Sequence, residues 1–251
     1  MPKYFAASPP PVSSPLPLVL ASASPRRRHL LGLLGMPFSV VASTVDESTI
    51  GGNSPLEFAQ NAAREKCLNV ASDLKTPSLV LAADTVVCFD LNKHPGEPSP
   101  THTHAFEERC LLSKGFRLFS SQQQVVLGKP SGPEEAAEML RCLSGRTHHV
   151  TTAIALWNGS PNPEVQAETS EVRFRVLSER EIQDYVASGE ALDKAGAYAV
   201  QKQGARLVRS VRGDLSNVIG MPLPLVIHML LPYYPHIGMP KEEDLMDAYR
   251  L

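Results

Sequence analysis

The alternation of apolar and polar positions along the chain predicts strands interleaved with helices. Apolar or β-branched runs typical of strands occur at residues 18–21, 78–89, 147–157 and 168–177. Capping sequences and apolar periodicity predict helices at residues 54–73, 131–143, 178–189 and 223–231. The last two strand runs follow each other closely, as in a long hairpin. The expected fold class is therefore α/β, with a mixed twisted sheet and flanking helices.

Composition shifts divide the chain into four parts. Residues 1–17 contain six prolines and several serines, which predicts an extended, disordered leader. A single domain is expected over residues 18–231. Within it, residues 91–124 mix Pro, His, Ser and Gln, and a loop of that length indicates a surface insertion. Residues 232–251 are expected to form a C-terminal tail, exposed from Lys241 onward.

The overall composition is that of a globular chain with a sizeable core. Hydrophobic residues make up 43% and charged residues 20% of its 251 residues. The formal net charge of -2 argues against a general nucleic-acid binder, because such proteins normally carry a basic excess. Oligomeric state is left open by the sequence, with a homodimer as one option.

Cysteine spacing and hydropathy indicate a cytoplasmic protein without a membrane segment. The four cysteines lie far apart and form no C-x-x-C pair, which favours reduced thiols over a zinc ribbon or a disulfide framework. No apolar stretch approaches the roughly 18 residues that span a bilayer, and the N-terminus lacks the apolar core of a signal peptide.

The junction after the first predicted strand has the features of an anion site. Ser24 suits a helix N-cap and Pro25 suits the first helical position, so helix-start amides would face the junction. Ser22 adds a hydroxyl, and Arg26 and Arg27 add planar guanidinium donors that match phosphate oxygens. The alternative is a solvated basic turn.

Acidic and basic side chains occur at two kinds of position. Asp84 interrupts a buried apolar run, so it needs a cation, a metal or a strand kink, or it makes a structural hydrogen bond to a loop. Glu47 is a second acidic candidate. Lys66 on a predicted helix and Lys129 after a glycine could hold phosphate, or could be surface lysines.

A segment rich in small residues predicts a tightly turned loop at one wall of a pocket. It carries Asp193, Lys194 and Tyr198, and Gln201 follows, whose amide could recognise the edge of a base. The chain has neither a G-x-x-x-x-G-K-[ST] nor a G-x-G-x-x-G sequence, which excludes P-loop and dinucleotide-binding folds.

Seven sequence blocks together resemble the Maf family of nucleoside triphosphate pyrophosphatases. In chain order they are SASPRR (22–27), AREK (63–66), ADT (83–85), GKP (128–130), LSGRTH (143–148), DKAGAY (193–198) and NVIGMPL (217–223). The resemblance covers about residues 18–231, interrupted by the insertion. It implies a fold similar to that of inosine triphosphate pyrophosphatases, with two lobes around a cleft.

The resemblance also implies roles for individual residues. Asp84 matches a proton acceptor, and Glu47 an acidic residue near a divalent metal, Mg²⁺ or Mn²⁺, which Asp84 would also bind. The positions matching triphosphate ligands are Arg27, Lys66 and Lys129, and those linked to substrate choice are Arg26, Thr85 and Gln201. Ser22, Asp193 and Lys194 are further substrate-binding candidates. The DKAGAY block is similar to the branch acting on dTTP and UTP.

The function expected from the resemblance is hydrolysis of pyrimidine triphosphates, ordinary or modified, to the monophosphate and pyrophosphate, which would cleanse the nucleotide pool. Asp84 would deprotonate the attacking water or orient it. Two alternatives are a non-catalytic nucleotide-binding regulator of cell division and a pyrophosphatase of the 7-methyl-GTP type. Nucleic-acid binding by the arginines at 26–28 is not favoured, because no basic stripe accompanies them.

Overall fold

A single mixed sheet organises the molecule. The computed structural model describes residues 16–91, 115–119 and 123–250; the predicted leader up to residue 15 and most of the predicted insertion lie outside these ranges. The strands are β1 (Leu18–Leu20), β2 (Phe38–Val40), β3 (Leu79–Asp90), β4 (Phe116–Phe119), β5 (Gln124–Leu127), β6 (Thr147–Trp157), β7 (Glu164–Phe174) and β8 (Val208–Arg212). Their order is β2-β1-β3-β6-β7-β8, with β5 pairing β3 and β4.

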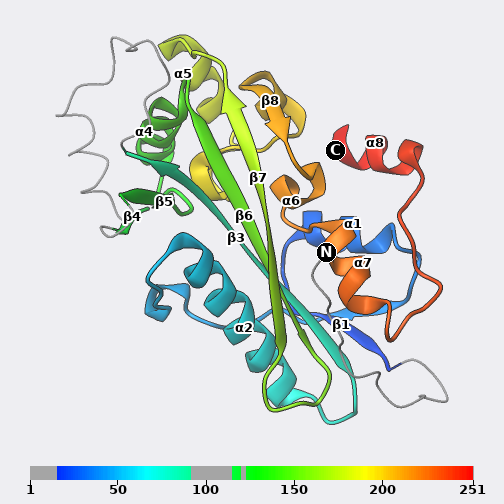
Figure 1. Cartoon of the computed structure of the whole chain (residues 1–251). Helices are drawn as coiled ribbons and strands as arrows, with labels where there is room; N and C mark the ends of the chain where they lie inside the picture. The colour runs from blue at the N-terminus through cyan, green and yellow to red at the C-terminus, as the bar shows by residue number, and fades with distance from the viewer. Residues whose placement is uncertain (1–15, 92–114, 120–122, 251) are drawn as a thin grey trace, which may run out of the picture.

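Helices cover both faces of this sheet. They are α1 (Pro25–Gly32), α2 (Pro55–Asp73), α4 (Pro133–Leu143), α5 (Glu179–Ala187), α6 (Leu215–Ile219), α7 (Leu223–Leu230) and α8 (Glu242–Arg250). Short 3₁₀ helices are η1 (Glu47–Thr49), η2 (Ala195–Ala197) and η3 (Lys202–Arg206). Figure 1 shows α2 on one side of the long strands and α1 and α7 on the other. The expected mixed α/β class is confirmed.

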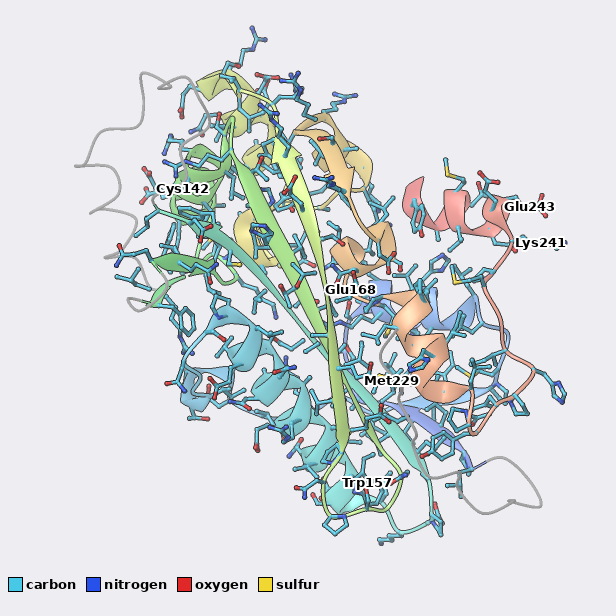
Figure 2. The ribbon with its side chains drawn as sticks, viewed as in Figure 1. Cys142, Trp157, Glu168, Met229, Lys241 and Glu243 are labelled. Carbon is cyan, nitrogen blue, oxygen red and sulfur yellow. The ribbon has the colours of Figure 1, made fainter. Side chains whose placement is uncertain are left out.

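Strand pairing is both parallel and antiparallel. β1 runs parallel to β2 and β3, whereas β3 and β6 pair antiparallel from Val80 and Trp157 to Cys88 and His149. β6 and β7 form the predicted long hairpin. At its far end the Trp157 indole donates to the Ser160 carbonyl at 2.7 Å, inside the connecting turn (Figure 2).

The hairpin is longer than predicted. β7 begins at Glu164, whereas the predicted strand starts at residue 168. Val165 and Ala167 alternate with polar residues and pack, half-buried, against the cluster that includes α2 residues, a short alternation that the prediction missed. Pairing with the buried β6 extends the strand through them.

β3 is buried on both faces, which explains its unbroken apolar sequence. Val80, Ala82 and Cys88 pack in the cluster that includes α2 residues. Leu79 and Leu81, which alternate with them, pack with α1 and α7 instead. Successive strand side chains point to opposite faces, so Asp84 is directed toward α2 and its neighbour Thr85 toward α1.

Side-chain caps confirm the predicted starts of α1, α2 and α5, whereas α4 and α7 begin without a side-chain cap. Ser54 Oγ accepts from the Glu57 amide at 3.1 Å, and Ser24 Oγ from the Arg27 amide at 3.4 Å. Ser178 begins α5 with a complete capping box. These local hydrogen bonds place the first turns of α1 and α2 beside the ends of β1 and β3.

Two segments differ from the simple picture of loop and tail. Residues 116–119, inside the predicted insertion, form β4, and Phe116 and Phe119 are buried. The expectation of an exposed tail after Lys241 is wrong for α8, because Ala248 is buried against the core. Within the described ranges, no helix combines the length and apolar character needed to cross a membrane.

Candidate active site

A cavity of about 690 Å³ lies where α1, α2, β3, β5 and the loop around residues 193–201 meet. All the residues singled out from the sequence line it: Ser22, Arg26, Arg27, Glu47, Lys66, Asp84, Thr85, Lys129, Asp193, Lys194 and Gln201. They come from segments up to 179 positions apart, from Ser22 to Gln201. The fold therefore brings the whole predicted set together, and the contacts within the set distinguish what each side chain can do.

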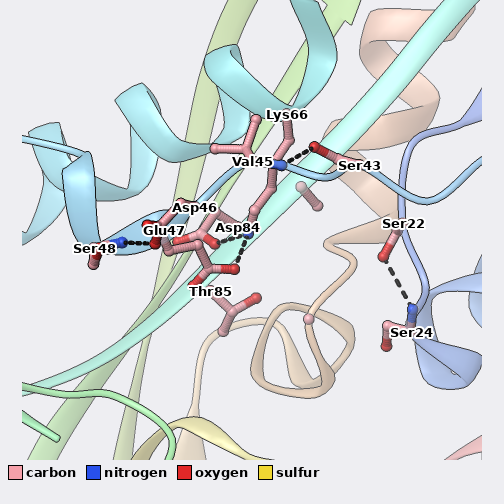
Figure 3. Close-up of polar contacts among 12 residues, drawn as sticks. Ser22, Ser24, Ser43, Val45, Asp46, Glu47, Ser48, Lys66, Asp84 and Thr85 are labelled. Atoms are coloured by element: carbon pink, nitrogen blue, oxygen red, sulfur yellow. Dashed lines mark hydrogen bonds and ion pairs between the residues drawn. The ribbon is translucent and has the colours of Figure 1, made fainter. Parts of the chain in front are cut away.

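One lysine and two carboxylates form the centre of the site. Lys66 Nζ lies 2.6 Å from Asp84 Oδ1 and 2.7 Å from Glu47 Oε1 (Figure 3). The Asp84 and Lys66 side chains are only 8% and 12% exposed, whereas that of Glu47 is 49% exposed. The Lys66 ammonium thus stabilises the Asp84 carboxylate, which interrupts the apolar strand β3. A buried carboxylate needs such a partner because burial removes its hydration.

Electrostatics keep Glu47 ionised at neutral pH. Burial, the largest single influence, would raise its pKa, but the hydrogen bond and charge of Lys66 together with the charges of Lys129 and Arg27 outweigh it. The net result is a pKa below the ordinary value for glutamate. Glu47 begins η1, where Asp46 caps the turn by accepting from the Ser48 amide at 2.9 Å.

Arg27 joins three parts of the site. Its guanidinium donates to the carbonyls of Gly220 at 3.0 Å and Ala83 at 2.8 Å, and to Thr85 Oγ1 at 2.9 Å. Burial lowers its pKa from the ordinary value, while the charges of Asp84 and Glu47 oppose that shift. A guanidinium has five N–H groups, so three bonds to protein leave two for a ligand. Arg27 is a structural strut as well as a candidate phosphate ligand.

Arg26, the neighbour of Arg27 at the start of α1, lies at the rim of the cavity. Arg26 Nη1 is 3.4 Å from Asp193 Oδ2, and Lys194 Nζ also pairs with Asp193. Lys194 donates to the Glu190 carbonyl at 2.6 Å as well. Burial would raise the pKa of Asp193, but Lys194 and Arg26 lower it overall. This contact joins α1 to the loop that follows α5.

Serine hydroxyls shape the junction between β1 and α1. Ser22 Oγ accepts from the Ser24 amide at 3.2 Å, and Ser24 Oγ in turn caps the helix (Figure 3). Ser22 is buried, and its hydroxyl proton is not used by this bond. The junction is a hydrogen-bonded turn beside the cavity, and the alternative of a solvated basic turn does not describe it.

The loop over the cavity is tightly turned, as its small residues predicted. Gly196 adopts φ +71°, and a Cβ built there would lie 3.0 Å from Val87 Cγ1. Tyr198, buried beside it, accepts or donates a 2.7 Å hydrogen bond with His148 Nε2. Gln201 is also buried, and its Nε2 donates to the Ala248 carbonyl of α8 at 2.6 Å.

Sequence reasoning missed Arg117. This β4 residue lines the cavity, donates to the Ile50 carbonyl at 2.9 Å and places its guanidinium carbon 4.4 Å from the centre of the Phe58 ring. It lies in the segment predicted to be an insertion, where no periodicity indicated a strand. Its alternation with buried Phe116 is the only local signal that could have indicated one.

The lining as a whole is basic. Its charged residues are Arg26, Arg27, Lys66, Arg117, Lys129 and Lys194 on the basic side, and Glu47, Asp84 and Asp193 on the acidic side. The excess of cations suits a polyanionic ligand, because guanidinium and ammonium groups complement phosphate oxygens. The fold and site thus define an α/β protein with a basic cleft and a centre of two carboxylates and one lysine.

The chain belongs to the Maf family. The sequence model of the family described as "Maf-like protein" matches residues 17–232. A protein of Moorella thermoacetica named dTTP/UTP pyrophosphatase is 43% identical over 208 residues, which cover 82% of this chain and 89% of that protein. A protein of Halalkalibacterium halodurans with the same name is 39% identical over 207 residues, 82% of this chain and 90% of the relative.

A solved structure of a HAM1 protein from Coxiella burnetii aligns with a TM-score of 0.35 and 21% sequence identity. The alignment covers 63% of this chain and 73% of that one. Family membership rests on the sequence relatives, not on this alignment.

Proposed function

We propose that this chain hydrolyses dTTP and UTP, or modified forms of them, to the nucleoside monophosphate and pyrophosphate. The observation that carries the proposal is the cluster of Asp84, Glu47 and Lys66 inside a basic cleft. The relatives that are 39% and 43% identical over 82% of this chain are named dTTP/UTP pyrophosphatases, which supports the substrate class.

The arrangement matches the demands of a triphosphate. Such a ligand carries about four negative charges, and they must be offset before a nucleophile can approach the α-phosphorus. Lys129 and the remaining N–H groups of Arg27 face the same cavity as Lys66. These donors would bind phosphate oxygens and withdraw charge from the bond that breaks.

Asp84 is our candidate for the group that handles the nucleophilic water. The water oxygen forms a bond to the α-phosphorus while the bond to the bridging oxygen breaks, and pyrophosphate leaves with that electron pair. Asp84 has two alternative roles: it accepts the water proton, or it orients the water without accepting the proton. Its position on a buried strand, bonded to Lys66 at 2.6 Å, holds the carboxylate in one place.

The two carboxylates also fit a divalent metal. Among the described residues no group of three His, Cys, Asp or Glu side chains could hold an ion. Mg²⁺ commonly uses only one or two carboxylates and completes its coordination with water and substrate phosphates, and Mn²⁺ accepts the same oxygen ligands. Glu47 and Asp84 would hold it, and when bound it would supply charge stabilisation at the phosphate oxygens.

A nucleotide panel tests the proposal. With Mg²⁺ present, dTTP and UTP should yield monophosphate and pyrophosphate, and EDTA should abolish turnover. Asp84→Asn should reduce turnover strongly, whereas Asp73→Asn, at the exposed end of α2, should leave it unchanged. An Asp84→Asn variant that works at the parental rate would overturn the catalytic assignment. Nucleotide binding without pyrophosphate release would favour the regulator instead.

We also propose that the chain acts in the cytoplasm. Cys67 on α2 and Cys88 on β3 are buried thiols that form no disulfide within the described ranges. Burial raises the pKa of Cys67 and of Cys88 to about 12, so these thiols are chemically inert. Free structural thiols support a reducing compartment. Cell fractionation with detection of the untagged chain would test this location.

A further inference from the structure

The C-terminal helix α8 lies outside the family match yet is built into the molecule. The family match ends at residue 232, and α8 begins at Glu242. Ala248 is 1% exposed, and Leu245 and Tyr249 are partly buried against the same core cluster as Leu215 of α6. Figure 1 shows α8 in red beside α6, and α6 residues line the cavity. This helix is therefore an addition that packs behind the site.

One hydrogen bond connects α8 directly to the cavity lining. Gln201 Nε2 donates to the Ala248 carbonyl at 2.6 Å, and this contact is buried. Ala248 lies in the last turn of α8, where carbonyls have no amide partner within the helix. Such a carbonyl needs a hydrogen-bond donor from outside the helix. It also carries part of the negative charge at the C-terminal end of the helix dipole, which strengthens a bond to such a donor. The side-chain amide of Gln201 satisfies it.

This hydrogen bond determines the orientation of the Gln201 side-chain amide. A glutamine amide has a donating nitrogen and an accepting oxygen, and a flip exchanges them. The Ala248 carbonyl can only accept, so a flipped Gln201 would place two oxygens against each other. Gln201 therefore keeps its nitrogen at α8. The amide oxygen is the end left for a ligand in the cavity that Gln201 lines.

We propose that α8 is a positioning element that holds the Gln201 oxygen as an acceptor for the base of the substrate. The inference rests on the proposed function. Thymine and uracil carry an N–H at ring position 3, which donates to such an oxygen, whereas cytosine carries an unprotonated nitrogen there. An acceptor held in place favours thymine and uracil, because cytosine would oppose it with a second acceptor.

The test displaces α8 without touching the cavity. Ala248→Trp overfills the buried position, and Met246→Gln, at a 45% exposed position of the same helix, is the matched control. We expect the ratio of kcat/KM for dTTP to that for dCTP to fall about tenfold in Ala248→Trp, the size of one lost net hydrogen bond. The loss should arise mainly in KM. Met246→Gln should keep the parental ratio.

A double-mutant cycle separates positioning from general damage. Gln201→Leu should lose the same selectivity, and adding Ala248→Trp to it should cause no further loss, since both act through one amide. If Ala248→Trp fails to fold, Leu245→Ala loosens the same helix without added bulk. Hydrogen exchange confirms that the α8 amides lose protection.

Three results would overturn the inference. They are an unchanged dTTP to dCTP ratio with α8 displaced, additive effects in the cycle, and an equal loss for every nucleotide. If the parent chain hydrolyses no nucleotide, the proposed function fails. The same ratio is then measured as Kd values for dTTP and dCTP by calorimetry, and equal affinities for the two refute the inference independently.

Discussion

Lowering the pH should destabilise the protein through one buried histidine, His148. This β6 side chain is fully buried, with its Nε2 bonded to the Tyr198 hydroxyl at 2.7 Å. Its ring packs edge to face against Phe174, with ring centres 5.0 Å apart. Burial, with a smaller contribution from the charge of His149, lowers the pKa of His148 to about 3. The folded protein therefore resists a proton that the unfolded chain accepts.

The direction and size follow from proton linkage. An unfolded histidine has its ordinary pKa of 6.5, and the folded one titrates at about 3. The folded state is at full stability above pH 6.5, and loses stability as the pH falls from there toward 3. Between pH 7.5 and pH 5 the loss for this pKa pair is about 2 kcal/mol.

Urea unfolding at the two pH values measures this loss. His148→Gln keeps a neutral polar side chain near Tyr198 and removes the titrating ring. Between pH 7.5 and pH 5, the free energy of unfolding of this variant should therefore drop by about 2 kcal/mol less than that of the parent. His228→Gln, at an exposed position of α7, is the matched control and should behave like the parent. An equal fall in His148→Gln and in the parent would refute the assignment of the acid sensitivity to His148.

Two further substitutions test the central cluster and the loop. Lys66→Met should lower the free energy of unfolding by about 3–5 kcal/mol, because it leaves the buried Asp84 carboxylate without its cation. Urea unfolding with and without Mg²⁺ should show partial recovery in the presence of the ion, and no recovery would count against the two-carboxylate metal site. Gly196→Ala should lower stability by about 1–2 kcal/mol, owing to the positive φ and the contact with Val87. Thermal melts measure this loss, and Gly32→Ala, in helix α1 with no atom within 4 Å of the added Cβ, is the control that should not lower stability.

Features determined by neighbouring residues could be predicted from the sequence. Ser54 and Ser178 mark helix starts because the amides they cap lie within three residues of them. Asp84 could be identified as an unusual carboxylate for a similar reason, since its apolar neighbours alone indicate burial. The identity of its partner, Lys66 on another element, depended on how α2 packs against β3.

Features that depend on distant packing could not be predicted in this way. β4 has four residues and pairs with β5, which is itself held by pairing with β3 on the other side of the predicted insertion. The sequence of α8 is mostly polar and therefore indicates an exposed tail. Only the fold shows that Ala248 packs against the core. The role of Arg27 changed for the same reason, because the sequence indicates a free guanidinium, whereas the fold supplies carbonyls from two other segments.

The strand β3 couples the Arg27 side of the site to its carboxylate side. Its alternation sends Asp84 to Lys66 on α2, and sends Thr85 to Arg27 on α1. Thr85 Oγ1 also lies 2.9 Å from Thr152 Oγ1, which ties the strand to β6. A shift of α1 would therefore pull β3 at residues adjacent to the catalytic candidate. Lys66 and Arg27 are both held by neighbouring residues of one buried strand, Asp84 and Thr85. The backbone geometry of β3 therefore sets the spacing between these two anchoring points.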